Sequence, residues 1–139
     1  MRNMNEYNYE AKILRVVDGD TIDVELTLAD VDLGFGIYLQ QRHCVKLRLA
    51  GINAPETSTK EGQQAKLNLK TILPEGGTCR VITVKDRTEK YGRYLAWVYL
   101  PVDPMTKQDS GWICLNDKLI EMGQAVPYNP SNIHKPVWP

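Results

Sequence analysis

The stretch Val45-KLRLAGINAPETSTKEGQQAKLNLKTI-Leu73 passes from a strand pattern to a helix pattern. Apolar residues alternate at its start, which predicts a half-buried strand with Arg48 on the face away from the core. The segment Ser58–Glu61 then has the form of a capping box, and apolar residues recur at helical spacing until Pro74. We therefore predict a strand, a turn and a helix that ends near Leu73.

Two segments before this stretch and two after it carry strand patterns, with alternation or with β-branched and aromatic residues. These four strands are expected at Ala11–Val17, Ile22–Leu28, Cys79–Lys85 and Arg93–Leu100, and a second helix is expected near Asn116–Met122. Five strands with a helix between the third and fourth is the order of an OB-fold. The predicted fold is therefore mainly β with helices (α+β), a five-stranded OB-fold barrel with two flanking helices.

The length of 139 residues is that of one domain, so residues 1–139 are expected to form a single OB-fold domain with a core from about 10 to 128. Four prolines from Pro127 onward predict that the tail, residues 129–139, runs extended. The long connection Ala29–His43 contains two glycines and scattered apolar residues. Both a long hairpin arm and a folded loop are compatible with this composition.

The charge balance is neutral, with 17 Lys and Arg against 17 Asp and Glu. A chain without a global positive field must bind nucleic acid through local basic groups. No segment approaches the roughly 20 apolar residues that a membrane span needs, and the N-terminus has no secretory apolar core. We therefore expect a cytoplasmic protein without a membrane partner, or a secreted one if a leader has been removed.

Asp18-Gly-Asp-Thr21 places two carboxylates around a glycine at a tight turn between strands. We expect Gly19 to adopt a positive φ there and to bring both acids toward one point. Such a pair can bind a hard cation, which requires oxygen ligands. The same four residues are also typical of an ordinary polar hairpin turn.

The strand that carries Arg48 ends in a proline-containing turn with Asn53, the Ala54 carbonyl and Glu56. An arginine, oxygen ligands and a carboxylate are what phosphodiester hydrolysis requires, because charge on the phosphate must be neutralised and water must be positioned or deprotonated. The alternative is a surface arginine beside an unrelated acidic residue in the turn.

Lys90-Tyr-Gly-Arg93 lies at the expected turn between the fourth and fifth strands. Its arginine would supply a second guanidinium group, which can donate two hydrogen bonds to the same phosphate. By itself this tetrapeptide is a common hairpin turn.

Together and in this order, the three motifs over about Lys12 to Tyr128 resemble the staphylococcal nuclease (thermonuclease-like) family. The resemblance implies a hydrolase, a Ca²⁺-dependent endonuclease that cleaves DNA and RNA with little sequence preference, prefers single strands and leaves 3′-phosphate products. It also implies the OB-fold. The oligomeric state stays open.

The resemblance implies roles residue by residue. Asp20 and the Ala54 backbone carbonyl would be calcium ligands, with Asn53 where the family usually has an aspartate. Apart from the resemblance, Asp18 could compensate for Asn53 through a bridging water. Arg48 and Arg93 would bind the phosphate and stabilise its transition state, and Glu56 would order or activate the attacking water. The nucleotide would be contacted by Lys90, Tyr91 and Tyr128.

Two departures from the family leave other functions open. Asn53 removes one negative charge from the cation site, so weaker calcium binding is expected, and the chain could be a catalytically silent OB-fold module that binds nucleic acid or protein. The connection Ala29–His43 is longer than in the family's prototype. It could reach over the substrate groove, mediate self-association, or serve a structural or assembly role.

Overall fold

The computed structural model describes residues 8–88, 94–101, 111–129 and 135. Its strands are β1 (Asn8–Asp18), β2 (Thr21–Gly34), β3 (Ile37–Leu49), β4 (Ile52–Asn53), β5 (Thr78–Thr88), β6 (Tyr94–Pro101), β7 (Trp112–Cys114) and β8 (Val126–Pro127). The helices are α1 (Lys60–Ile72) and α2 (Leu115–Glu121). Neither helix in this described part of the chain is long and apolar enough to cross a membrane.

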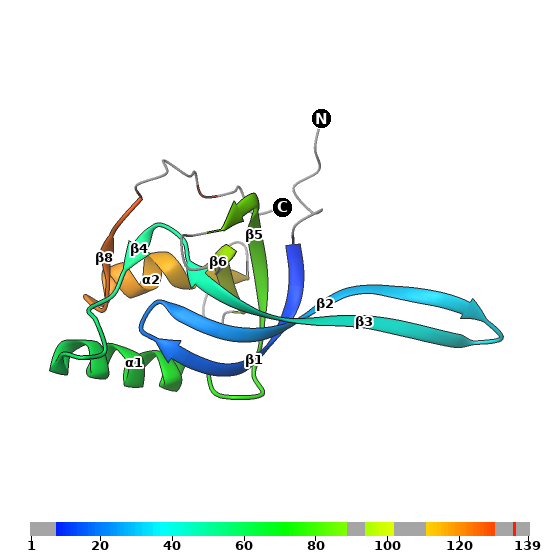
Figure 1. The fold of residues 1–139 in the computed structure, drawn as a ribbon, viewed down its shortest axis with the longest axis horizontal. Helices are drawn as coiled ribbons and strands as arrows, with labels where there is room; N and C mark the ends of the chain where they lie inside the picture. Colours follow the sequence, from blue (N-terminus) through cyan, green and yellow to red (C-terminus); the bar gives the residue numbers. More distant parts are fainter. Residues whose placement is uncertain (1–7, 89–93, 102–110, 130–134, 136–139) are drawn as a thin grey trace.

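Five strands close into a barrel. They are hydrogen-bonded in the order β3-β2-β1-β5-β6, and β3 also pairs with β6 in parallel, which joins the two ends of the sheet. The helix α1 follows the third barrel strand and precedes the fourth, and it lies beside β1 in Figure 1. This arrangement confirms the predicted OB-fold with two flanking helices.

The barrel interior is apolar because each strand turns alternate side chains inward. In β2, Ile22, Val24 and Leu26 are buried, as are Leu47 and Leu49 of β3. The helix α1 adds its inward positions Ala65 and Leu69 to the buried residues, and α2 adds Leu115 and Leu119. The predicted alternation therefore does place these residues in one core.

The first helix begins one residue later than its capping pattern predicts. Thr59, not Ser58, is the N-cap, and its hydroxyl accepts a hydrogen bond from the Gly62 amide at 3.0 Å. The Thr59 amide and hydroxyl also donate to the Glu56 carbonyl oxygen, at 3.0 and 2.7 Å. Because the preceding turn holds Thr59 in this way, the turn sets where α1 starts.

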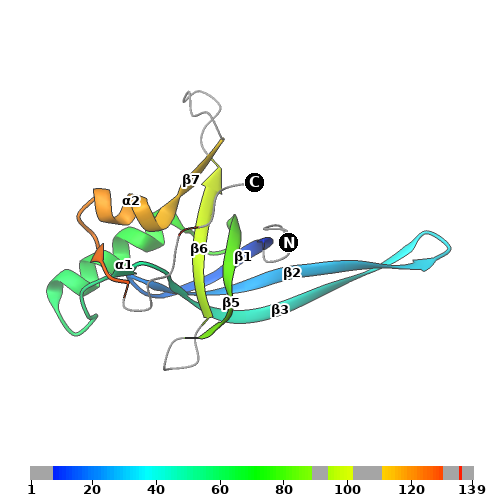
Figure 2. The same ribbon diagram turned by 90° about the horizontal axis from the view of Figure 1, so that it is seen from above.

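The connection Ala29–His43 is a long hairpin arm, so the folded-loop alternative is excluded. β2 and β3 stay paired from the barrel out to Gly34 and Ile37, beyond their expected ends. At the tip, Phe35 has a φ of 57°. The arm extends away from the barrel in both ribbon views (Figures 1 and 2).

A second, smaller apolar cluster lies around Trp97. It joins Trp97 and Tyr99 of β6 to Ala50 and Ile82, all of them buried. Gly51, with a φ of 77°, packs closely against Trp97, since a Cβ at position 51 would lie 2.9 Å from the Trp97 ring.

The last strand of the described chain, β8, lies just before the predicted extended tail, so that prediction is not tested by it. Val126–Pro127 pairs with Ile52–Asn53 as a two-stranded sheet. Of residues 129–139, the structure describes only 129 and 135, so the conformation of most of the tail lies outside the described residues.

Candidate active site

Asp20 is the first element of the site, in the turn that joins β1 to β2. The residue is only 8% exposed, and its Oδ2 accepts a hydrogen bond from the Ala54 amide at 2.8 Å. The Thr21 hydroxyl donates to Asp20 Oδ1 at 3.1 Å, and the Leu49 amide donates to the Asp20 carbonyl at 2.8 Å. These contacts fix one carboxylate at the end of β3.

Gly19 allows this turn to approach its neighbours, but not through the expected positive φ. Its φ lies outside the left-handed region. A Cβ at position 19 would instead lie 2.9 Å from the Ala54 Cβ and 3.0 Å from the Ala65 Cβ. Glycine is needed because this turn is pressed against the turn after β3 and against α1.

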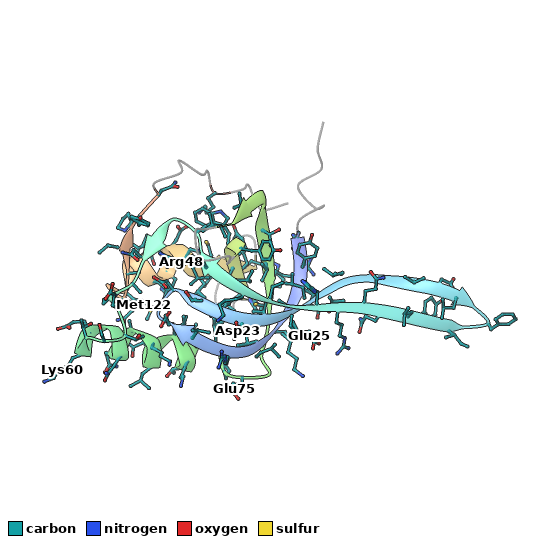
Figure 3. All side chains as sticks on the ribbon, viewed as in Figure 1. Asp23, Glu25, Arg48, Lys60, Glu75 and Met122 are labelled. Carbon is teal, nitrogen blue, oxygen red and sulfur yellow. The ribbon has the colours of Figure 1, made fainter. Side chains whose placement is uncertain are left out.

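Arg48 lies on β3 and is the second element of the site. Its position between Leu47 and Leu49 turns it away from the apolar core, as predicted, yet it is only 8% exposed. Arg48 Nη1 donates to the Leu49 carbonyl at 2.8 Å, and Nη2 lies 3.4 Å from Asp20 Oδ2. The alternative of a surface arginine is therefore wrong. Figure 3 shows Arg48 at the end of the barrel remote from the arm.

Asn53 of β4 joins the same cluster. Its Oδ1 accepts a hydrogen bond from Arg48 Nη2 at 3.2 Å. Asp20 Oδ2 and Asn53 Oδ1 thus both lie within 3.4 Å of one guanidinium nitrogen. Two residues that the sequence predicts as calcium ligands therefore contact the same guanidinium nitrogen.

The turn around Glu56 is attached to the start of α1 through its main chain. The Glu56 carbonyl is so close to α1 that a Cβ at Gly62 would lie 1.7 Å from its oxygen. The Glu56 side chain is exposed, and within the described residues no hydrogen bond or ion pair engages its carboxylate. The backbone is held while the carboxylate is left available to solvent.

Tyr128 is brought to this end of the barrel by the short sheet of β4 and β8. Its amide donates to the Gly51 carbonyl at 2.8 Å, and Val126 pairs with Asn53. The tyrosine is half exposed. Three other expected site residues, Lys90, Tyr91 and Arg93, lie outside the described residues.

Ionic balance limits what the cluster can bind. Asp20 and Arg48 form a buried ion pair with opposite charges, and Asn53 adds no charge. Asp18 is half-buried at the start of the same turn. Within the part of the chain that the structure describes, no three His, Cys, Asp or Glu side chains form a metal-binding group. A cation would depend on amide and main-chain oxygens beside Asp20.

Three residues that shape this region were not singled out in the sequence. Thr59 and Gly62 attach the Glu56 turn to α1. Asn116 is fully buried, its Oδ1 accepting from the Val98 amide and its Nδ2 donating to the Ala50 and Ala96 carbonyls. A glycine in the first turn of a helix is the one sequence signal that could have indicated a close approach.

The comparison with protein families agrees with this geometry. Residues 46–136 match the family described as staphylococcal nuclease homologue. The chain belongs to the staphylococcal nuclease family. The matched segment contains Arg48, Asn53 and Glu56, while Asp20 comes from the hairpin before it.

Individual relatives of the staphylococcal nuclease family are similar at modest identity. A protein from Shigella flexneri named micrococcal nuclease is 31% identical over 95 residues, which are 68% of this chain and 45% of that protein. Two proteins named uncharacterized endonuclease, from Escherichia coli O157:H7 and Escherichia coli, are 30% identical over 128 residues, which are 92% of this chain. This chain spans 45% to 66% of the length of these relatives.

Proposed function

We propose that this protein is a Ca²⁺-dependent endonuclease that hydrolyses phosphodiester bonds in DNA and RNA with little sequence preference, with single strands preferred. The observation that carries the proposal is the cluster in which the buried Arg48 contacts both the buried Asp20 and the exposed Asn53. Folding alone does not require a buried arginine and aspartate, and burying charges costs free energy. Membership of a nuclease family supports the same reaction class.

Arg48 carries the positive charge in this reaction. A guanidinium offers several donors in a fixed plane, so it can bind two phosphate oxygens at once. Its limited exposure matters because a charge interaction is stronger where water is partly excluded. Arg48 would therefore stabilise the negative charge that increases on the phosphate as the bond to the attacking oxygen forms.

Two side-chain oxygens of the kind that calcium prefers contact this arginine. Asp20 Oδ2 and Asn53 Oδ1 both contact Arg48 Nη2, at 3.4 and 3.2 Å. Asp20, Asn53 and the Ala54 carbonyl would hold the ion, with Asp18 contributing through a water. A bound calcium ion would neutralise phosphate charge and orient the substrate.

The attacking water would be positioned or deprotonated by Glu56. Its carboxylate is exposed and its backbone is fixed by Thr59, so it can meet a water without reorganising the turn. Arg93 would bind the phosphate from the other side. Lys90, Tyr91 and Tyr128 would contact the nucleotide, the tyrosines by stacking or by hydrogen bonds.

Cleavage of heat-denatured DNA tests this function directly. The protein is incubated with substrate and calcium, with and without a chelator, beside the Arg48→Ala variant. We expect cleavage that the chelator abolishes and that the variant lacks. Native DNA and RNA in the same assay test strand and sugar preference, and end-group analysis tests for 3′-phosphates.

A silent binding module is the second candidate, and Asn53 is the observation that favours it. With an amide at this position, Asp20 is the one carboxylate that contacts Arg48 among the described residues, and their charges cancel. Absence of chelator-sensitive cleavage above the level of the variant, together with retained binding of denatured DNA or of a protein, would establish this second function instead.

A further inference from the structure

A side-chain hydrogen bond joins the first helix to the segment that leads from α2 into the candidate site. Asn68 Nδ2 donates to Gln124 Oε1 at 2.6 Å, and the two residues are 56 positions apart in the chain. Asn68 lies on α1 directly before the buried Leu69, whereas Gln124 lies in the connection between α2 and β8. The bond therefore links a helix that contributes to the core with the segment that enters the site.

The Asn68 amide is oriented for this bond by a second one. Gln64 Nε2, one turn earlier on α1, donates to Asn68 Oδ1 at 2.9 Å. Residues four apart lie on the same side of a helix, so this pair forms without distortion. Because the Asn68 oxygen accepts from Gln64, the Asn68 nitrogen is the atom that meets Gln124. Asn68 and Gln124 are both half-buried, so less water competes for their bond than at an exposed position.

The strand that follows Gln124 has few main-chain hydrogen bonds of its own. β8 consists of Val126 and Pro127, and proline has no N–H to donate. Both residues are exposed, and among the described strands β8 pairs only with the equally short β4. A two-stranded sheet of this size is marginally stable by itself. The position of β8 therefore depends on the contacts at its two ends.

One end of β8 is attached to α1, and the other end lies in the site. At the first end, Gln124 accepts from Asn68, and the small buried Ala125 follows it. At the other end, the half-exposed Tyr128 donates its amide to the Gly51 carbonyl at 2.8 Å. Figure 1 shows β8 alongside β4 between these two ends. Tyr128 follows Gln124 by only four residues, so a shift of Gln124 is passed on to Tyr128.

We infer that Asn68 is a positioning residue for the proposed nuclease: through Gln124 it holds β8 in place and so orders Tyr128 for the nucleotide. The inference rests on the proposed function, in which Tyr128 contacts the nucleotide. Asn68 does not itself touch the substrate. It restricts the positions that Tyr128 can occupy before the substrate binds, and preorganisation of this kind raises affinity. The effect of losing Asn68 is therefore expected in KM rather than in kcat.

Hydrogen exchange in the Asn68→Leu variant tests whether Asn68 holds Tyr128, since this change removes the amide at nearly constant side-chain size. We expect the Tyr128 amide to exchange about fivefold faster than in the wild type, the equivalent of one neutral hydrogen bond, while amides of β1 keep their rates. The measurement needs no substrate, so it separates the positioning role from the proposed function. An unchanged exchange rate of the Tyr128 amide, or an equal acceleration in β1, would overturn the inference.

Cleavage kinetics of denatured DNA at saturating calcium test whether the reaction uses this position. We expect Asn68→Leu to raise KM about fivefold and to leave kcat within about twofold of the wild type. Asn68→Asp should restore the wild-type KM, because the Gln124 amide can rotate and donate its Nε2 to the new carboxylate. Gln63→Leu makes the same change at an exposed position of α1 and is the matched control, with a wild-type KM expected. A lower kcat at unchanged KM would refute the positioning role.

A double-mutant cycle with Tyr128→Ala shows whether Asn68 acts through Tyr128. We expect Asn68→Leu to raise KM no further once Tyr128 is alanine, since the side chain that Asn68 positions is gone. Effects of the two substitutions that simply multiply would contradict the inference. Absence of chelator-sensitive cleavage in the wild type would instead contradict the proposed function, and exchange of the Tyr128 amide would still decide whether Asn68 holds this residue.

Discussion

The Arg48 guanidinium lies 3.4 Å from the Asp20 carboxylate, and each residue is only 8% exposed. Asp20 directly precedes β2, and Arg48 lies on β3 opposite Thr21, so their meeting depends on the pairing of β2 with β3. A buried charge whose partner is removed costs far more than an exposed one. Removing either partner alone is therefore expected to destabilise the fold, because the other charge would stay buried without a counter-charge.

Asp20→Ala is expected to lower the free energy of unfolding by about 3 kcal/mol, because Arg48 would remain buried without its carboxylate partner. The control is Asp23→Ala, which removes a carboxylate 2.6 Å from the mostly exposed Arg15 and should cost less than about 1 kcal/mol. Guanidinium denaturation of both variants measures the difference. Equal losses would show that the Asp20–Arg48 pair adds no special stability.

Asn53→Asp is expected to lower the calcium concentration for half-maximal cleavage by about tenfold. The change adds one negative charge where Asn53 Oδ1 now contacts Arg48 Nη2, and calcium affinity rises with the charge of its ligands. A calcium titration of cleavage measures the effect, with Asn53→Ala expected to need more calcium than the wild type. An unchanged or higher requirement in Asn53→Asp would mean that position 53 does not face the metal.

Gly62→Ala is expected to destabilise the protein by about 1–3 kcal/mol although alanine favours helices. The new Cβ would lie 1.7 Å from the Glu56 carbonyl oxygen, so the Glu56 turn must move. We also expect cleavage to slow by about 10- to 100-fold, since displaced catalytic groups lose efficiency steeply. Gln63→Ala, at the next and exposed position, should change neither stability nor cleavage; a similar effect of both substitutions would argue against this contact.

The buried thiol of Cys79 is expected to make the free energy of unfolding decrease at alkaline pH. Burial raises the pKa of its thiol from 9.0 to about 12, because the charged thiolate is disfavoured inside the core. The contribution of Cys79 to the free energy of unfolding is fully present below pH 9. It is lost as the pH rises toward 12, at about 1.4 kcal/mol per pH unit. Cys79→Ala should reduce the slope of unfolding free energy against pH, whereas the exposed Cys44 replaced by alanine should not. Parallel slopes for all three proteins would contradict this assignment.

The fold was largely predictable from the sequence because alternation in strands and periodicity in α1 depend on local patterns. Alternation in the strand expected at Ile22–Leu28 and in the one that begins at Val45 predicts one inward face each. Ile22, Val24, Leu47 and Leu49 are buried accordingly, whereas Leu28 is 42% exposed. The arm was not predictable, because its residues are compatible with pairing or with a loop. Only the continued register of β2 and β3, fixed by the barrel, selects the hairpin.

The sequence indicated which residues would meet in the candidate site, but not that Asp20 and Arg48 are buried or which tertiary contacts hold them. Asp20, Arg48 and Asn53 do meet, as their motifs indicated. Alternation placed Arg48 on the outer face, but could not show that neighbouring turns cover that face. The role of Gly19 was misjudged for a related reason, since its close contacts with Ala54 and Ala65 are tertiary and leave no local pattern.

The rate of cleavage of denatured DNA by Glu56→Gln at saturating calcium tests the proposed active site most directly. Glu56 is exposed, so the variant should keep the wild-type free energy of unfolding within about 0.5 kcal/mol. We predict a rate at least about 100-fold below that of the wild type, because the group that positions or deprotonates water is lost. Glu61→Gln, an exposed carboxylate in the first turn of α1, should retain the wild-type rate. Equal rates for Glu56→Gln and the wild type would contradict the assignment of this site as the nuclease centre.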